Sequence, residues 1–151
     1  MNKCIRCGNK KFRSMPHPLK QELDGHLFTA TVPSKKCTQC GESYFDAEGG
    51  ILFQQAIAQK LIDMGTSSGA AFKFLRKTLG IKASDLAPLL DVAAETISRW
   101  ETGERAVDHA AMALLGVLVA EKLDGRSTTV NRLRSMRKPR GFAKNVRLAL
   151  A

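Results

Sequence analysis

The four cysteines of the chain form two Cys-x-x-Cys-Gly pairs, with 29 residues between the pairs. Two thiolates at this spacing can converge on one metal ion, and the glycine after each pair permits the tight turn that they need. Catalytic zinc sites generally keep one position open for water, whereas four thiolates close the coordination shell. The pattern therefore predicts one structural zinc ion, with two disulfides or a redox pair as the alternatives. The predicted ligands are Cys4, Cys7, Cys37 and Cys40.

Disulfides require an oxidising compartment, and residues 1–4 do not begin an apolar secretory segment. No apolar run approaches the roughly 20 residues that a membrane span requires. We therefore expect a protein of the cytoplasm, associated with the nucleoid and not with a membrane. Because compact zinc ribbons often have loops of only about 15 to 20 residues, the long segment between the cysteine pairs is expected to carry strands of its own.

The residues around and after the cysteines indicate a small module of strands followed by a helix. Residues 27–32 have strand composition and follow Asp24-Gly25, which is a hairpin signal, so a strand pair is predicted over about residues 18–33. Apolar residues at helical spacing predict a helix over 51–64, and 65–69 has the composition of a linker. We therefore predict a zinc-binding domain with its following helix at 1–64, a second domain at 65–125 and a tail at 126–151.

Three short helices are predicted in the second domain. The first covers about residues 70–79 and stops at Gly80, and the third covers 95–102 and stops at Gly103. The second is expected to begin at Ser84, whose hydroxyl can accept a backbone N–H bond as an N-cap. Two short helices joined by about three residues match a helix-turn-helix.

Side-chain spacing supports this geometry. The small Ala87 lets the two helices approach, Asp91 can adopt the left-handed conformation of the turn, and Ile97 can fill the angle between the helices. A generic helical hairpin is the alternative. Trp100 is expected to pack in the core, because proteins that read duplex DNA rarely need an aromatic platform.

These residues resemble a known family. The segments 74–80, 85–87 and 96–103 are similar to the Xre or phage-repressor class of helix-turn-helix proteins. Joined to a four-cysteine module, the chain over residues 1 to 122 resembles the MqsA-type antitoxins, also called YgiT-type zinc-finger regulators. The resemblance implies an α+β protein whose N-terminal zinc domain engages a toxin, and whose all-α helix-turn-helix domain dimerises and represses its own operon. It also implies a structural ion pair between Arg76 and Glu101.

The third helix is the predicted DNA reader, because the N-terminal residues of a recognition helix touch base edges in the major groove. Arg99 could bind guanine with two hydrogen bonds, Thr96 could meet a thymine methyl group, and Glu95 could accept a hydrogen bond from cytosine. Ala94 also points toward DNA in this register. Contacts to phosphates are expected from the start of the second helix, the loop after the third, and nearby positions. The candidates are Lys77, Lys82, Ser84, Ser98 and Arg105.

The segment 109–122 predicts a helix that is too apolar to be buried on one side only. A homodimer would cover the second side, and repressors of this class read paired half-sites about one DNA turn apart. Leu114 and Leu118 are the predicted interface residues. The alternative is a monomer in which the second apolar face packs against the helix at residues 50–64.

The formal charge of +10 is concentrated in the tail, which contains eight basic residues and no acidic one. Basic residues that met phosphates would make DNA affinity fall steeply with salt, and the alternative is a disordered, solubilising tail. A zinc-containing, DNA-binding repressor, the antitoxin of a type II pair, is the leading hypothesis. A stand-alone regulator and an RNA- or ribosome-associated zinc protein are the alternatives. No enzyme is predicted, because His17, His26 and His109 have no partner pattern and no nucleophile motif occurs.

Overall fold

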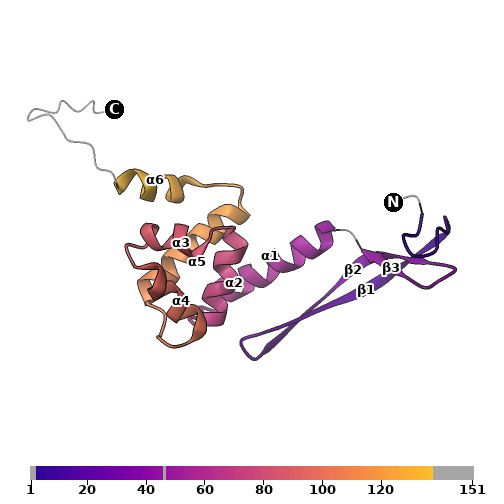
Figure 1. Ribbon diagram of the computed structural model, residues 1–151, viewed down its shortest axis with the longest axis horizontal. Coiled ribbons are helices and arrows are strands. Elements are labelled where there is room, and N and C mark those ends of the chain that lie inside the picture. The colour runs from indigo at the N-terminus through magenta and orange to yellow at the C-terminus, as the bar shows by residue number, and fades with distance from the viewer. Residues whose placement is uncertain (1–2, 46, 138–151) are drawn as a thin grey trace, which may run out of the picture.

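A computed structural model describes residues 3–45 and 47–137 of the chain (Figure 1). An antiparallel sheet of order β1-β2-β3 comes first and helices follow, so the predicted α+β class is confirmed. None of the helices in the described part of the chain is both long and apolar enough to cross a bilayer. The elements are β1 (Phe12–Leu23), β2 (His26–Cys37), β3 (Ser43–Phe45), α1 (Ala47–Asp63), α2 (Gly69–Leu79), α3 (Ala83–Leu86), the 3-10 helix η1 (Ala87–Leu89), α4 (Ala94–Thr102), α5 (His109–Leu123) and α6 (Thr128–Met136).

Strands β1 and β2 form a hairpin that is longer at both ends than the predicted 18–33. The turn is the predicted Asp24-Gly25, whose φ angles of 55° and 75° are those of a two-residue hairpin loop. Pro16 pairs in register with Pro33. Proline lacks a backbone donor and is depleted in strand interiors, so these two positions are atypical of the strands that contain them.

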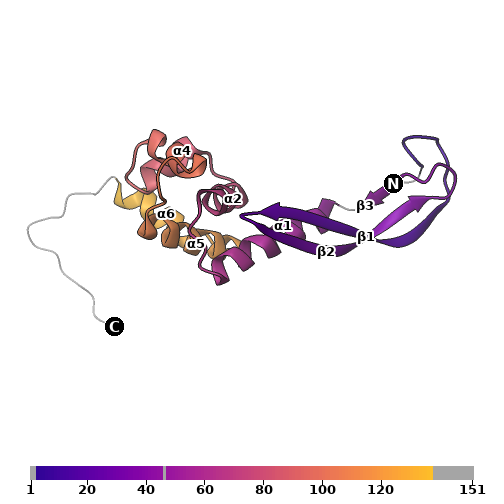
Figure 2. The same cartoon turned by 90° about the horizontal axis from the view of Figure 1, so that it is seen from below.

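The hairpin runs alongside helix α1, as both views show (Figures 1 and 2). A Cβ atom added to Gly49 would lie 3.2 Å from Val32, and the side-chain amide of Gln54 donates to that of Gln21 at 2.6 Å. One face of the sheet is therefore partly covered by α1. The opposite face, which includes Ser14, is exposed.

Helix α1 also enters the core of the helical part. Its buried residues Phe53, Ile57 and Leu61 belong to the same apolar cluster as residues of α2, α4 and α5. Part of the second apolar face of α5 therefore packs against α1, as the monomer alternative proposed. The segment after α1 turns at Gly65, where φ is 63°, and the predicted domain boundary there remains a prediction.

The helix-turn-helix prediction matches the geometry of α3, η1 and α4. Asp91 adopts the left-handed conformation with φ of 54°, as predicted, and Gly80 and Gly103 end α2 and α4 at φ of 78° and 79°. The predicted cap was wrong. Helix α3 begins at Ala83 because Lys82 holds the extended N-cap conformation, and the Ser84 hydroxyl bonds the Asp85 carboxylate at 3.4 Å and not a backbone N–H.

Trp100 packs in the core, as predicted. Its ring meets that of Phe72 edge-on at 5.4 Å between centroids, and its side chain is buried. The backbone of α2 approaches this residue closely, because a Cβ atom added to Gly69 would overlap the Trp100 carbonyl oxygen. The start of α2 and the end of α4 are therefore in direct contact.

The first part of the predicted tail, after the predicted boundary at residue 126, is a packed helix. Val130 of α6 is buried and Leu133 packs against the core. The carboxylate of Glu121 on α5 accepts hydrogen bonds from the backbone N–H and the hydroxyl of Thr129, at 2.9 Å and 2.8 Å. The basic residues Lys138, Arg140, Lys144 and Arg147 lie outside the described residues.

Candidate metal centre and recognition helix

The four cysteine sulfurs lie within 4.8 Å of one another. The Sγ atoms of Cys4 and Cys40 are 3.5 Å apart, and those of Cys7 and Cys37 are 3.6 Å apart. A tetrahedral shell with Zn–S bonds of about 2.3 Å requires sulfur–sulfur separations of about 3.8 Å. These two separations are slightly shorter than this value and none among the four sulfurs exceeds 4.8 Å, so the four residues form the site of one structural zinc ion.

The two cysteine pairs repeat one backbone geometry. The N–H of Gly8 donates to the Cys4 carbonyl at 2.8 Å, and the N–H of Gly41 donates to the Cys37 carbonyl at 3.1 Å. Both glycines have positive φ, 75° and 76°, a conformation that side chains disfavour. The glycine of each Cys-x-x-Cys-Gly pair is therefore what closes the loop around the sulfurs.

Hydrogen bonds divide the four thiols into two kinds. The Tyr44 hydroxyl lowers the pKa of Cys4, and the backbone N–H of Cys40 lowers the pKa of Cys37 to about 6. At Cys7 a backbone hydrogen bond from Asn9 has a lowering effect, but desolvation and the neighbouring thiols outweigh it and raise the pKa to about 12. Cys4 and Cys37 are thus the first to become thiolates, and a bound cation favours ionisation of all four.

Two polar side chains that sequence reasoning missed contact the sulfurs. The Tyr44 hydroxyl lies 3.1 Å from the Sγ atom of Cys4, and the Asn9 amide nitrogen lies 3.4 Å from that of Cys37. Tyr44 is four residues beyond Cys40 on strand β3, and no spacing rule points to it. Asn9 directly follows the Cys4–Gly8 loop, and this position was the one signal in the sequence for a contact with the metal site.

Helix α4 presents the predicted DNA-reading residues on its outer face. Ala94, Glu95, Ser98 and Arg99 are exposed, whereas Ile97 and Trp100 face the core. Thr96 is half-buried and lines a groove of about 450 Å³ together with Arg105. The arrangement can offer a guanidinium, a carboxylate and hydroxyls to one ligand surface.

The predicted phosphate contacts fall into two places. Lys82 and Ser84 lie at the start of α3, next to α4, and Arg105 follows α4; all three are exposed. Lys77 is also exposed, but it lines a separate hollow with Gln21 of β1 and Lys122 of α5. The structure therefore does not bring Lys77 together with the other candidates.

The predicted interface residues of α5 differ in burial. The side chain of Leu118 is only 1% exposed and belongs to the core of its own chain, so it offers no surface to a partner. Leu114 is half-buried in the groove that also contains Leu89 and Thr96. Val117, which was not predicted, is 50% exposed.

A known protein family matches most of the chain. Residues 2–123 match the family described as the antitoxin component of a bacterial toxin–antitoxin system, MqsA. No curated protein matches the chain significantly. The matched residues include the four cysteines, the hairpin and the helices through α5, and α6 lies beyond them. Because the match covers most of the chain, this protein belongs to the MqsA family of antitoxins.

Proposed function

We propose that this antitoxin is a sequence-specific DNA-binding repressor that binds the operator of its own operon as a homodimer. The observation that carries the proposal is the outer face of α4, where Glu95, Ser98 and Arg99 are exposed side by side on a helix anchored by Ile97 and Trp100. A helix held in this way can enter the major groove without rearranging the fold.

The chemistry of α4 suits base recognition. Arg99 can donate two hydrogen bonds to guanine, and Glu95 can accept one from the amino group of cytosine, with about 1 to 3 kcal/mol of discrimination for each good bidentate pair. Because Thr96 is half-buried, its contact with a thymine methyl group would be made at the edge of the helix. Lys82, Ser84 and Arg105 would bind the flanking phosphates and set the register.

Dimerisation would align two copies of α4 with paired half-sites. Helix α5 carries no charged residue from Ala110 to Ala120. Because Leu118 is buried in the core of its own chain, we propose that the dimer contact is made by Leu114 and Val117. Burial of part of α5 against α1 leaves a smaller apolar surface for this contact than the sequence implied.

The N-terminal zinc module is proposed to bind the toxin, and the family membership of the chain supports this assignment. Its sheet has one face directed away from α1, which leaves that face available to a protein partner. Co-expression with the product of the adjacent open reading frame tests this part, since a toxin should co-purify with the full-length chain.

The repressor proposal is tested by fluorescence anisotropy of the metal-loaded chain. A duplex from its own promoter should bind more tightly than a shuffled duplex at moderate ionic strength, and structured RNA should compete poorly. Equal affinity for the two duplexes would overturn sequence-specific repression. Tighter binding of RNA would favour the RNA-associated alternative.

A further inference from the structure

The hydroxyl group of Tyr44 is held between two partners at the metal centre. The backbone N–H of Ile5 donates to its oxygen at 3.1 Å, and its oxygen lies 3.1 Å from the Sγ atom of Cys4. A phenol has only one proton to donate. Because the Tyr44 oxygen accepts from the N–H of Ile5, the phenolic proton is free to point at the sulfur of Cys4.

Asn9 occupies a comparable place at the second cysteine pair. Its amide nitrogen lies 3.4 Å from the Sγ atom of Cys37, 3.1 Å from the Lys11 carbonyl and 3.0 Å from the Thr38 hydroxyl, so these three acceptors share its two protons. Its amide oxygen accepts from the N–H of Lys11 at 3.2 Å, which fixes which end of the amide faces the sulfur. The side chain is therefore oriented by bonds at both ends.

The two sulfurs that face these donors occupy the same position in the two cysteine pairs. Cys4 and Cys37 are the first cysteines of the two knuckles, and both are buried, with exposed fractions of 1% and 2%. Cys7 is exposed and Cys40 is half-buried, so water can reach them more easily. A buried thiolate has little access to solvent and gains most from a donor supplied by the protein.

We propose that Tyr44 and Asn9 are positioning residues of the zinc site, each donating one hydrogen bond to a buried thiolate. Four thiolates around one Zn²⁺ carry a net charge of −2, and hydrogen bonds from neutral groups disperse this charge and fix the orientation of the sulfurs. The inference concerns the metal centre alone and does not depend on DNA binding.

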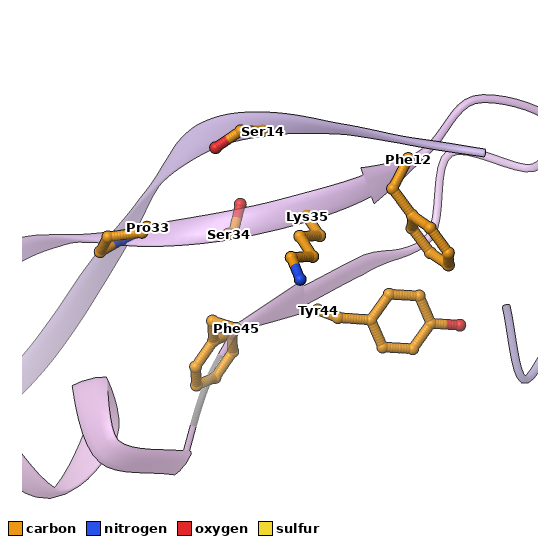
Figure 3. Close-up of a pocket in the computed structure, with 7 residues that line it drawn as sticks. All are labelled: Phe12, Ser14, Pro33, Ser34, Lys35, Tyr44 and Phe45. Carbon is orange, nitrogen blue, oxygen red and sulfur yellow. The ribbon is translucent and has the colours of Figure 1, made fainter. Parts of the chain in front are cut away.

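Tyr44 also connects the metal centre to the strand that leads into α1. Its ring meets that of Phe12 edge-on at 5.9 Å, and both rings line a hollow of about 150 Å³ beside Lys35 (Figure 3). Strand β3 is only three residues long, and Tyr44 at its centre pairs with Lys35 of β2. The bond from Tyr44 to Cys4 therefore adds a tie between a very short strand and the first knuckle.

Because ring packing holds Tyr44 independently of its hydroxyl, Tyr44→Phe keeps the ring in place and removes the bond to Cys4, together with the bond that the hydroxyl accepts from the N–H of Ile5. We expect this variant of the full-length chain to bind zinc about 10- to 100-fold more weakly in competition with a chelating dye. With Co²⁺ as the probe, the sulfur-to-metal charge-transfer band should move to lower energy, because a thiolate that loses a hydrogen bond gives up electron density more easily. Asn9→Ala should act in the same direction through Cys37.

Ser34→Ala is the matched control. The Ser34 hydroxyl is buried in the same sheet and donates to the Met15 carbonyl at 2.8 Å, but it bonds no sulfur. Any loss of zinc affinity in this variant measures the effect of sheet stability alone. The charge-transfer band of its Co²⁺ form should not move. The proposal is overturned for Tyr44 if Tyr44→Phe leaves the band unmoved or weakens zinc binding no more than Ser34→Ala does. The same two measurements on Asn9→Ala, compared with Ser34→Ala, test the proposed bond to Cys37. They test it even if Tyr44→Phe binds no metal.

Discussion

The guanidinium of Arg76 binds both carboxylate oxygens of Glu101, with N–O distances of 2.5 Å and 3.1 Å. Their side chains are only 12% and 9% exposed, and a third nitrogen of Arg76 donates to the Ile81 carbonyl at 2.8 Å. The pair joins α2 to the C-terminal end of α4, the helix proposed to read DNA. It therefore fixes the orientation of that helix at its C-terminal end.

Replacing Arg76 by alanine should destabilise the chain by about 3 kcal/mol, because it leaves a largely buried carboxylate without its partner. Chemical denaturation followed by circular dichroism measures this loss. Arg126→Ala is the control, since its ion pair with Asp124 is 63% and 61% exposed and should contribute less than about 1 kcal/mol. Equal effects of the two substitutions would contradict a structural role for the Arg76–Glu101 pair.

Gly69→Ala should destabilise the chain by about 1 to 3 kcal/mol, because the added methyl group would overlap the Trp100 carbonyl oxygen and force α2 and α4 apart. Gly50→Ala in α1 meets no atom within 4 Å and should be neutral or slightly stabilising. Thermal unfolding of both variants tests the contact. A Gly69→Ala protein as stable as Gly50→Ala would show that α2 and α4 are not packed this closely.

The attachment of α6 should depend on pH through Glu121. The backbone hydrogen bond from Thr129 holds the pKa of Glu121 below its ordinary value of 4.5. The ionised carboxylate therefore contributes stability above that value, and the contribution is lost as the pH falls through the lowered pKa. The protection factor of the Thr129 amide, which is the intrinsic exchange rate divided by the rate that NMR measures at the same pH, should fall under these acidic conditions. In Glu121→Gln, this protection factor should already be lower at neutral pH and should change little as the pH falls.

Zinc removal should unfold the sheet while the helical core persists, because metal binding supplies folding free energy to small thiolate modules. Hydrogen exchange after chelation should lose protection in β1 and β2 but keep it around Ile97 and Leu115, which are fully buried among the helices. Protection should return when zinc is added. Collapse of both parts together would mean that α1, which touches sheet and helices, makes them one cooperative unit.

Several parts of the fold were predictable because local chemistry determines them. The cysteine spacing requires convergence on one metal ion, and the left-handed conformations of Asp91 and Gly103 follow from residue types that tolerate positive φ. The ion pair of Arg76 and Glu101 came from a resemblance and not from spacing, since 24 residues separate the two positions.

Other parts depend on long-range packing and were missed for that reason. Leu118 looks the same in sequence whether a partner or the chain's own core covers it, and only the structure decides. Helix α6 has few apolar residues, so its docking depends on Val130 and on the bond from Thr129 to Glu121. Tyr44 reaches Cys4 through the pairing of β2 with β3, which no motif encodes.

The central claim is that α4 reads operator DNA through Arg99, and Arg99→Lys tests it most directly. Lysine keeps the positive charge but cannot make the paired hydrogen bonds of a guanidinium, so nonspecific attraction should persist while base readout fails. The measurement is the ratio of affinities for the chain's own promoter and a shuffled duplex, at a fixed salt concentration. The account predicts a clear preference for the promoter in the native chain and at least about a fivefold loss of that preference in Arg99→Lys, equivalent to about 1 kcal/mol. An unchanged ratio in Arg99→Lys, or no preference in the native chain, would contradict it.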